Sequence, residues 1–330
     1  MEKEYLTEPL IICKLKSNYN IDVVTINELQ LGADADALIY KAQADDDRLY
    51  FVKLKRGHHD ICATLQLLLS NAIIKEVIPP IMTLDGKPTS HVDDFNLIVY
   101  PFIEGQDGFS KRLTDDQWIE LGKALRHLHE FQLPASIASQ IKQESYSSHW
   151  RETVRSMYEN IESVKPCDKI AAGFLVDLQK YRSVIMRLVE RAQQLALIIQ
   201  KQSVDNVLCH GDLHAGNVLI AKDGSFYIID WDQPICAPKE RDLMFIGAGI
   251  GNVWNNNREV ELFYTGYGKV EINQEIIDYY RCERIIQDIA EYYQQLLSDT
   301  IDYNDKLASY NHFVAMFAPN GVVEIALYDY

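Results

Sequence analysis

Residues 210–232 combine a polar loop with a short β-hairpin, and this stretch constrains the fold more than any other. Two apolar runs flank residues 222–225, and an Asp-Gly pair between β-prone runs predicts a hairpin. Asp212 and Asn217 then lie in the loop that enters the first strand, and Asp230 ends the second. Because Mg²⁺ takes carboxylate and amide oxygens together with phosphate oxygens, these side chains indicate a phosphoryl-transfer site.

Two other interpretations of the same residues stay open. His210, Asp212 and His214 would suit the metal triad of a hydrolase, since residues of these types bind zinc. Alternatively, Asp212 and Asn217 would merely hydrogen-bond the loops of a structural turn. Asp230 counts against both interpretations, because neither needs an aspartate at the end of the hairpin.

The order of these residues carries a resemblance to a known family. Residues 210–220, His-Gly-Asp-Leu-His-Ala-Gly-Asn-Val-Leu-Ile, with the later Asp230, resemble the catalytic segment of the aminoglycoside phosphotransferase and choline kinase superfamily. By that resemblance Asp212 is the catalytic base, Asn217 binds Mg²⁺, and Asp230 is the counterpart of the aspartate in the Asp-Phe-Gly motif of kinases. The cofactors implied are ATP and Mg²⁺.

The resemblance also implies the fold and its division. We expect a two-lobed α+β protein-kinase-like fold, with a small N-terminal sheet lobe and a larger, mainly helical C-terminal lobe. Residues 1–100 would form the nucleotide-binding lobe, residues 101–110 the hinge, and residues 111–330 the catalytic and substrate-binding lobe. In this family the hinge contacts adenine, which places Tyr100 and Phe102 among the expected nucleotide contacts.

Lys53 is the expected phosphate-binding residue of the first lobe. Residues 49–55 predict a strand in which apolar side chains flank Lys53, and a desolvated ammonium needs a charged partner. In the family that partner includes the α- and β-phosphates of ATP. An edge-strand lysine that faces solvent is the alternative, since Lys55 and Arg56 lie close by.

Two further nucleotide-site residues are expected in this lobe. Family members pair the lysine with a glutamate of the next helix, which here offers only Asp60 near its start and Glu76 near its end, and we expect Asp60. The turn between strands at 23–26 and 37–42 corresponds to the loop that covers the phosphates. Such loops are glycine-rich, but only Gly32 is present, and an ordinary hairpin turn is the alternative.

Helical patterns dominate the chain after the hinge. A capping box at residues 114–117 opens a helix that must end before Pro134, and helical spacing covers residues 148–202. By the resemblance, Asp242 supports the catalytic loop, either by accepting backbone hydrogen bonds or by pairing with an arginine. No segment like a protein-kinase activation loop follows Asp230, so we do not expect a protein substrate.

An acidic helix predicted over residues 274–298 is the expected substrate contact. Asp288 and Glu291 lie three residues apart and therefore on one face, next to Tyr292. Such a face binds an ammonium group through charge and ring contact. A solvated helix face without a ligand is the alternative.

Composition limits the partners. The net charge of −16 argues against nucleic acid and anionic membranes and favours a small cationic partner, although solubility alone also explains it. The six cysteines form no Cys-x-x-Cys pair, the start lacks a signal-peptide pattern, and no apolar run approaches about 20 residues. We therefore expect a cytoplasmic protein. We also expect a monomer or weak dimer.

The resemblance covers most of the chain and suggests a substrate. Within the superfamily, residues 50–57, the hinge and the catalytic segment look most like spectinomycin phosphotransferases. This implies ATP-dependent phosphorylation of a hydroxyl on a small cationic aminocyclitol antibiotic, which gives resistance. The motif residues fit choline, homoserine or methylthioribose kinases equally well. A non-catalytic nucleotide-binding module is the alternative of another class.

Overall fold

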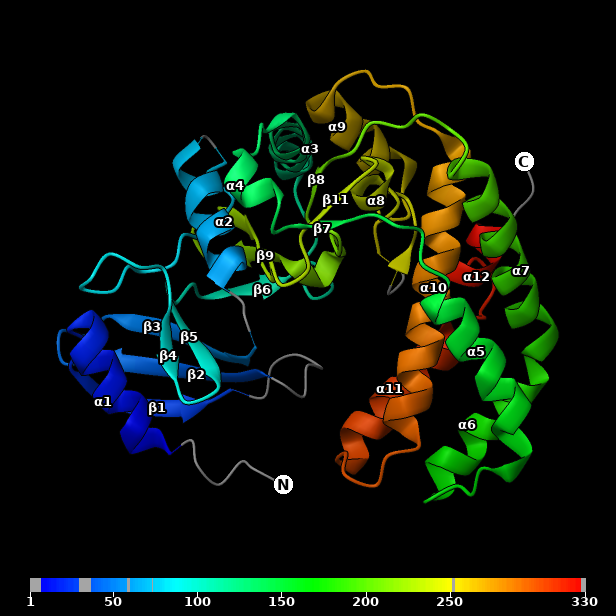
Figure 1. The fold of residues 1–330 in the computed structure, drawn as a ribbon, viewed down its shortest axis with the longest axis horizontal. Coiled ribbons are helices and arrows are strands. Elements are labelled where there is room, and N and C mark those ends of the chain that lie inside the picture. The colour runs from blue at the N-terminus through cyan, green and yellow to red at the C-terminus, as the bar shows by residue number, and fades with distance from the viewer. Residues whose placement is uncertain (1–6, 30–36, 58–59, 73, 251–252, 328–330) are drawn as a thin grey trace. The chain divides into compact units, whose positions relative to one another are not determined.

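The chain consists of two compact units. The computed structural model describes residues 7–29, 37–57, 60–72, 74–250 and 253–327 (Figure 1). The first unit comprises Met1–Gln117, Lys123–Lys142 and Gly216–Pro234, and the second comprises Trp118–Gly122, Gln143–Ala215 and Ile235–Tyr330. The lobe boundaries at residues 100 and 110 stay predictions.

A five-stranded antiparallel sheet forms the centre of the first unit. Its order is β1-β2-β3-β5-β4, and the strands are β1 (Val23–Glu28), β2 (Ala37–Ala44), β3 (Leu49–Arg56), β5 (Phe95–Pro101) and β4 (Ser90–Val92). The predicted strands at residues 23–26, 37–42 and 49–55 are all confirmed. Helices α1 (Glu8–Tyr19) and α2 (Asp60–Ala72) belong to the same unit, and α2 confirms the predicted helix.

The alternation along β3 determines which side chains enter the core and which stay available for chemistry. Tyr50, Val52 and Leu54 are buried in one apolar cluster with residues of α1. Since successive strand residues point to opposite faces, Lys53 and Lys55 share the other face. A strand with this pattern therefore presents two lysines on the side opposite its hydrophobic core.

A second, three-stranded sheet of the first unit carries the predicted hairpin. Its order is β10-β9-β6, and the strands are β10 (Phe226–Ile228), β9 (Val218–Ala221) and β6 (Gly105–Asp107). The turn of the hairpin places Gly224 at φ 88°, a conformation that glycine adopts readily. A Cβ at Gly105 would lie 2.5 Å from the carbonyl oxygen of Ile220, so glycine permits the close pairing of β6 with β9.

Helices build most of the second unit. Helices α5 (His149–Asn160), α6 (Lys169–Lys180), α7 (Arg182–Ile199), α10 (Gln274–Leu296) and α11 (Tyr303–Ala315) share one core, and α10 runs beside α5 and α7 (Figure 1). The helical predictions for residues 148–202 and 274–298 are confirmed. The predicted capping box is also confirmed: the Thr114 hydroxyl accepts from Gln117 at the start of α3 (Asp115–Glu130).

Short elements complete the described chain. A three-stranded sheet has the order β7-β11-β8, with β7 (Lys142–Gln143), β11 (Ile235–Ala237) and β8 (Val207–Cys209). The other helical segments are α4 (Ala135–Ala138), η1 (Ile161–Ser163), η2 (Ala215–Asn217), α8 (Glu240–Leu243), α9 (Asn257–Tyr267) and α12 (Val322–Leu327). Among the described residues, none of the helices is both long and apolar enough to span a bilayer.

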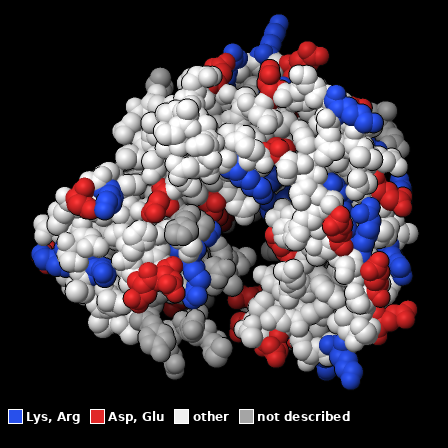
Figure 2. Space-filling view, in the orientation of Figure 1, with Lys and Arg blue, Asp and Glu red and all other residues white. Residues whose placement is uncertain are grey.

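Charged side chains of both signs are scattered over the face drawn in Figure 2. On the face drawn in Figure 2, Asp and Glu lie among Lys and Arg and among a larger area of other residues. The acidic side chains outnumber the basic ones over the whole sequence, 48 to 32. The expectation of a small cationic partner rests on this excess, which equally serves solubility.

Candidate active site

A buried carboxylate supports the loop that follows β8. Asp242 of α8 is fully buried, and it accepts hydrogen bonds of 2.8 Å from the backbone N–H groups of His210 and Gly211. Hydrogen bonds to a charged acceptor are stronger than neutral ones. The predicted role of Asp242 is therefore confirmed, and it orders the backbone immediately before Asp212.

Asp212 is held as an anion by its surroundings. Its side chain is 27% exposed, a guanidinium N–H of Arg284 donates to its Oδ1, and Nε2 of His214 lies 3.6 Å from its Oδ2. Burial by itself raises the pKa of Asp212, but Arg284 and, to a smaller extent, the histidines lower it below the usual value. A carboxylate in this state can accept a hydrogen bond from a hydroxyl group.

Asn217 and Asp230 adjoin each other in the first unit. Asn217 ends η2, and its carbonyl oxygen accepts a 2.9 Å hydrogen bond from the N–H of Ile229, the residue before Asp230. Asp230 has φ 61°, in the left-handed region that aspartate tolerates better than most residues. The Asp230 side chain is 51% exposed. An amide oxygen and an accessible carboxylate at neighbouring strand ends fit the oxygen ligands that Mg²⁺ requires.

Lys53 is paired with two carboxylates of the same unit. Its ammonium lies 3.1 Å from Oδ1 of Asp230 and 2.8 Å from both carboxylate oxygens of Asp232. Burial lowers the pKa of Lys53, but the two aspartates more than offset this effect, and the net pKa is raised. Lys53 is therefore a cation with a defined direction on the face of β3 opposite the core.

The expected pairing of Lys53 with Asp60 is wrong. Asp60 instead accepts a hydrogen bond from the Thr89 hydroxyl and lies 3.9 Å from the imidazole of His91. The partner of Lys53 is Asp232, which also accepts from Lys55. Sequence reasoning searched only the helix after the lysine; the available signal was a second aspartate two residues after Asp230.

The other expected nucleotide residues are engaged within the first unit or lie outside the described residues. The Tyr100 hydroxyl donates to the side chain of Gln66 in α2, and burial raises the pKa of Tyr100. The Phe102 ring lies 4.4 Å from the ammonium of Lys41, and its N–H donates to the carbonyl of Leu49. Gly32 lies outside the described residues. The adenine contacts of Tyr100 and Phe102 stay predictions.

The expected substrate face of α10 contains an arginine that sequence reasoning missed. Nε of Arg284 donates to Oδ1 of Asp288 at 2.8 Å, and Glu291 accepts a 2.8 Å hydrogen bond from Gln287. Burial raises the pKa of Asp288 to about 6. Tyr292 is partly buried beside a neighbouring ring. The available signal was that Arg284 lies four residues before Asp288, hence on the same helix face.

Residues 28–262 match the model of the phosphotransferase enzyme family, which is more than half of the chain. The chain belongs to this phosphotransferase family. The predicted family and the class of ATP-dependent phosphotransferase agree with this finding. A curated relative, protein StrN of Streptomyces griseus, is 26% identical over 220 residues. That match covers 63% of this phosphotransferase and 66% of StrN, just under two thirds of the relative.

Solved structures confirm the predicted kinase-like α+β fold of this phosphotransferase. Spectinomycin phosphotransferase APH(9)-Ia in complex with ADP and spectinomycin is 45% identical, with a TM-score of 0.89, and the match covers 97% of this chain and 98% of that chain. The AMP complex of that enzyme is 44% identical over the same shares, with a TM-score of 0.86. Choline kinase LicA from Streptococcus pneumoniae is similar in fold, with a TM-score of 0.58 and 17% sequence identity. That match covers 93% of this chain and 97% of LicA.

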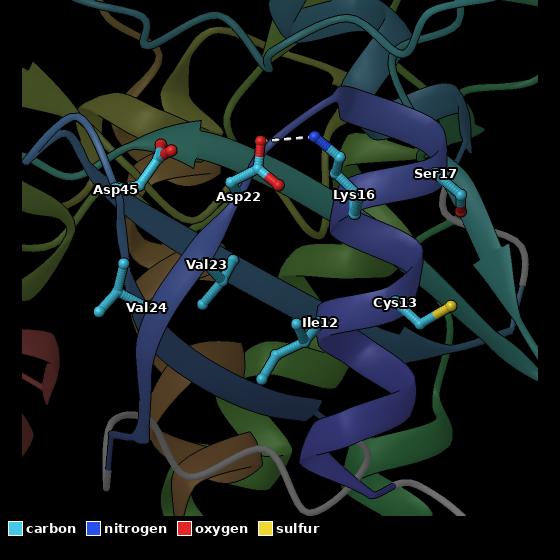
Figure 3. Close-up of a pocket in the computed structure, with 8 residues that line it drawn as sticks. All are labelled: Ile12, Cys13, Lys16, Ser17, Asp22, Val23, Val24 and Asp45. Atoms are coloured by element: carbon cyan, nitrogen blue, oxygen red, sulfur yellow. Dashed lines mark hydrogen bonds and ion pairs between the residues drawn. The ribbon is translucent and has the colours of Figure 1, made fainter.

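One pocket of the phosphotransferase lies apart from these residues. It has a volume of about 390 Å³ and lies between α1 and β1, where Ile12, Cys13 and Val23 are among its lining side chains (Figure 3). Lys16 and Asp22 form an ion pair of 2.5 Å at its rim. Its lining includes none of the predicted site residues, so it is not part of the candidate active site.

Proposed function

We propose that this phosphotransferase transfers the γ-phosphoryl group of ATP to a hydroxyl group of spectinomycin and thereby confers resistance. The observation that carries the proposal is the 45% identity, over 97% of the chain, to an enzyme whose structure contains ADP and spectinomycin. The similarity to choline kinase at 17% identity supports the fold alone and does not favour choline as the acceptor.

The first unit supplies the groups that would bind the nucleotide. Lys53, a cation held by Asp232, binds the phosphates of ATP, and Tyr100 and Phe102 contact its base. Asn217 and Asp230 would hold Mg²⁺, and this ion would neutralise phosphate charge when bound. The Asp230 side chain is 51% exposed and its carboxylate is open to an incoming ion, which supports this assignment, whereas Asn217 is 7% exposed.

Asp212 of the second unit acts on the acceptor. As an anion it accepts a hydrogen bond from the acceptor hydroxyl, aligns its oxygen with the γ-phosphorus, and takes the proton late in the reaction. The acceptor oxygen forms a bond to phosphorus, the bond from phosphorus to the ADP oxygen breaks, and ADP leaves. Because such transition states are loose, most of the acceleration comes from positioning and charge neutralisation.

The acceptor is a cation, and the acidic face of α10 is our proposed contact for it. Asp288 and Glu291 supply carboxylates near Tyr292, a combination that stabilises an ammonium group by charge and ring contact. The carboxylate of Asp288 is already shared with Arg284. Glu291 is exposed and accepts a hydrogen bond from the half-buried Gln287, so it is the more accessible of the two for an acceptor ammonium.

Turnover with a panel of acceptors tests the proposal. Purified protein with Mg²⁺ and ATP is assayed for ADP formation with spectinomycin, a kanamycin-type aminoglycoside, choline and homoserine, and GTP then replaces ATP. We expect turnover with spectinomycin. Turnover confined to another acceptor would support the phosphoryl-transfer reaction but would show that spectinomycin is not the substrate. Nucleotide binding without any turnover would favour the non-catalytic module instead.

Asp212→Ala tests the mechanism independently of the acceptor's identity. We expect turnover to fall by about 10²- to 10⁴-fold, the usual contribution of a positioned base, while calorimetry shows ATP binding close to that of the wild type. Glu159→Gln, which removes an exposed carboxylate of α5, is the matched control and should leave both quantities unchanged. A near-normal rate for Asp212→Ala would refute the assignment.

The cellular setting stays a prediction. Cys62, Cys209 and Cys282 are buried, and all six cysteines are free thiols, which fits the reducing compartment we expect for a cytoplasmic protein. We also expect a monomer or weak dimer. Light scattering of the purified protein measures the oligomeric state, and a stable tetramer would contradict that expectation.

A further inference from the structure

Arg284 lies between two carboxylates of the second unit, and each engages a different part of its guanidinium. Nε donates to Asp288, one turn further along α10, at 2.8 Å, and Nη1 donates to Oδ1 of Asp212. The Arg284 side chain is 18% exposed, and the Phe245 ring lies 5.9 Å from the centre of its guanidinium. Because the guanidinium is a rigid plane, the hydrogen bond at Nε also fixes the direction of Nη1.

Other groups around Asp212 are charged conditionally or act at longer range. Nε2 of His214 lies 3.6 Å from Oδ2 and carries charge only when protonated, and the His210 ring accepts from the N–H of Asp212 at 3.3 Å. Arg241 is a further cation of the surroundings, and Asp288 is an anion across Arg284. Arg284 combines a permanent charge with a direct hydrogen bond to the Asp212 carboxylate.

We propose that Arg284 is a positioning residue of this phosphotransferase: anchored on Asp288, it holds the Asp212 carboxylate in the orientation and the anionic form that meet the acceptor hydroxyl. The proposal rests on the proposed function of Asp212 as the base. It assigns Asp288 a structural duty toward Arg284 in addition to the substrate contact proposed above.

Geometry explains why a positioning residue would matter here. A carboxylate turns about its Cβ–Cγ bond, and an acceptor hydroxyl needs one of its oxygens at a defined place. Arg284 binds Oδ1 of Asp212, while Oδ2 lies 3.6 Å from Nε2 of His214. When a reacting group is misplaced by about 1 Å, the rate can fall by about a hundredfold, so restricting this rotation contributes to the rate.

Charge gives the same residue a measurable signature. Burial raises the pKa of Asp212, and Arg284 is the largest of the influences that lower it. Without Arg284 the effect of burial would dominate, and the pKa of Asp212 would rise. The acidic limb of the rate profile would then move to higher pH, since the base must be ionised to accept the hydroxyl proton.

Steady-state kinetics of Arg284→Met and Arg284→Lys, measured between about pH 5 and pH 9, test the proposal. For Arg284→Met we expect kcat to fall roughly ten- to a hundredfold, the KM for ATP to stay within about twofold of its original value, and the acidic limb to move upward. Arg284→Lys should recover part of both changes, because lysine restores the charge without the planar fork. Asp288→Asn removes the anchoring charge, and its kcat should lie between those of Arg284→Met and Arg284→Lys.

Arg281→Met is the matched control, because Arg281 lies on the same helix and donates to the backbone carbonyls of Met244 and Ile246. It should change stability without moving the acidic limb. A fall in kcat for Arg284→Met with an unmoved limb would show a merely structural role and overturn the proposal. So would an unchanged kcat.

A titration of Asp212 by carbon NMR needs no acceptor. In protein labelled at aspartate carboxyl carbons, the Asp212 signal is assigned by its loss in Asp212→Asn, and it should titrate below the usual range. Arg284→Met, or Arg284→Lys if the first variant does not fold, should raise that pKa. An unchanged pKa of Asp212 in the Arg284 variant overturns the inference, even if the enzyme is active. A raised pKa together with no turnover overturns only the proposed function.

Discussion

Asp232 accepts hydrogen bonds of 2.8 Å from the ammonium of Lys53 through both of its carboxylate oxygens. Asp230, the proposed metal ligand, lies 3.1 Å from the same ammonium. The segment after the hairpin therefore supplies both the proposed metal ligand and the anchor of the phosphate-binding lysine. The carboxylate that holds Lys53 therefore comes from the segment after β10 and not from α2. Asp60 of α2 instead accepts a hydrogen bond from the Thr89 hydroxyl.

Asp232→Asn should weaken nucleotide use, and Asp60→Asn should not. Losing a hydrogen bond between charged groups costs about 1.5–3 kcal/mol, so we expect the KM for ATP to rise by roughly 10- to 100-fold in Asp232→Asn. Asp60→Asn keeps an oxygen that can accept the hydrogen bond from Thr89. Its KM for ATP should stay within about twofold of the wild-type value. Steady-state kinetics at varied ATP concentration measure both variants, and the opposite ranking would restore Asp60 as the partner.

Arg151 and Glu283 form a buried ion pair that joins α5 to α10. Arg151 is 1% exposed, its guanidinium donates to the Glu283 carboxylate, and Tyr279 lies against it. Removal of one member of a buried pair typically costs about 3–5 kcal/mol when the other stays charged, so the measurement is made above pH 7, where Glu283 is ionised. We expect Arg151→Met to lose about that much free energy of unfolding in urea, and Arg151→Met with Glu283→Gln to recover part of it. Equal losses in the two variants would contradict this.

The carboxyl group of Glu283 should make stability depend on pH. Burial raises its pKa to about 7, although Arg151 opposes the shift, whereas the unfolded chain has the ordinary value near 4.5. Between these values the folded state binds more protons, so the free energy of unfolding should fall as pH rises from 4.5 to 7, by an amount on the order of 3 kcal/mol. Urea titrations across this range should show a smaller fall in Glu283→Gln. An identical pH profile for the two proteins would rule out this group as the cause.

Gly224 should tolerate Asn better than Ala. It has φ 88°, and a Cβ would meet nothing within 4 Å, so the cost of substitution comes from backbone conformation alone. Left-handed backbone costs an alanine roughly 1–2 kcal/mol, and asparagine less. We expect Gly224→Ala to lower the free energy of unfolding by about that amount and Gly224→Asn by less than half of it. A cost for both above about 3 kcal/mol would mean that the turn packs against other residues.

Local patterns predicted the secondary structure because their causes are local. The hairpin follows from an Asp-Gly pair between β-prone runs, and the start of α3 follows from Thr114 and Gln117, three residues apart. The role of Asp242 was predicted from the resemblance to the family, and its two backbone hydrogen bonds confirm it. Gly32 lies outside the described residues, and its role stays a prediction.

The sequence by itself determined the hairpin, the strands, the helices and the identity of Asp212, Asn217 and Asp230 as candidates. Only the tertiary structure decided their partners. Lys53 meets Asp232 across 179 positions of the chain, and Asp212 meets Arg284 across 72. Turn chemistry and hydrophobic periodicity act over a few residues, whereas which carboxylate faces which cation depends on how strands and helices pack, and no spacing along the chain encodes that.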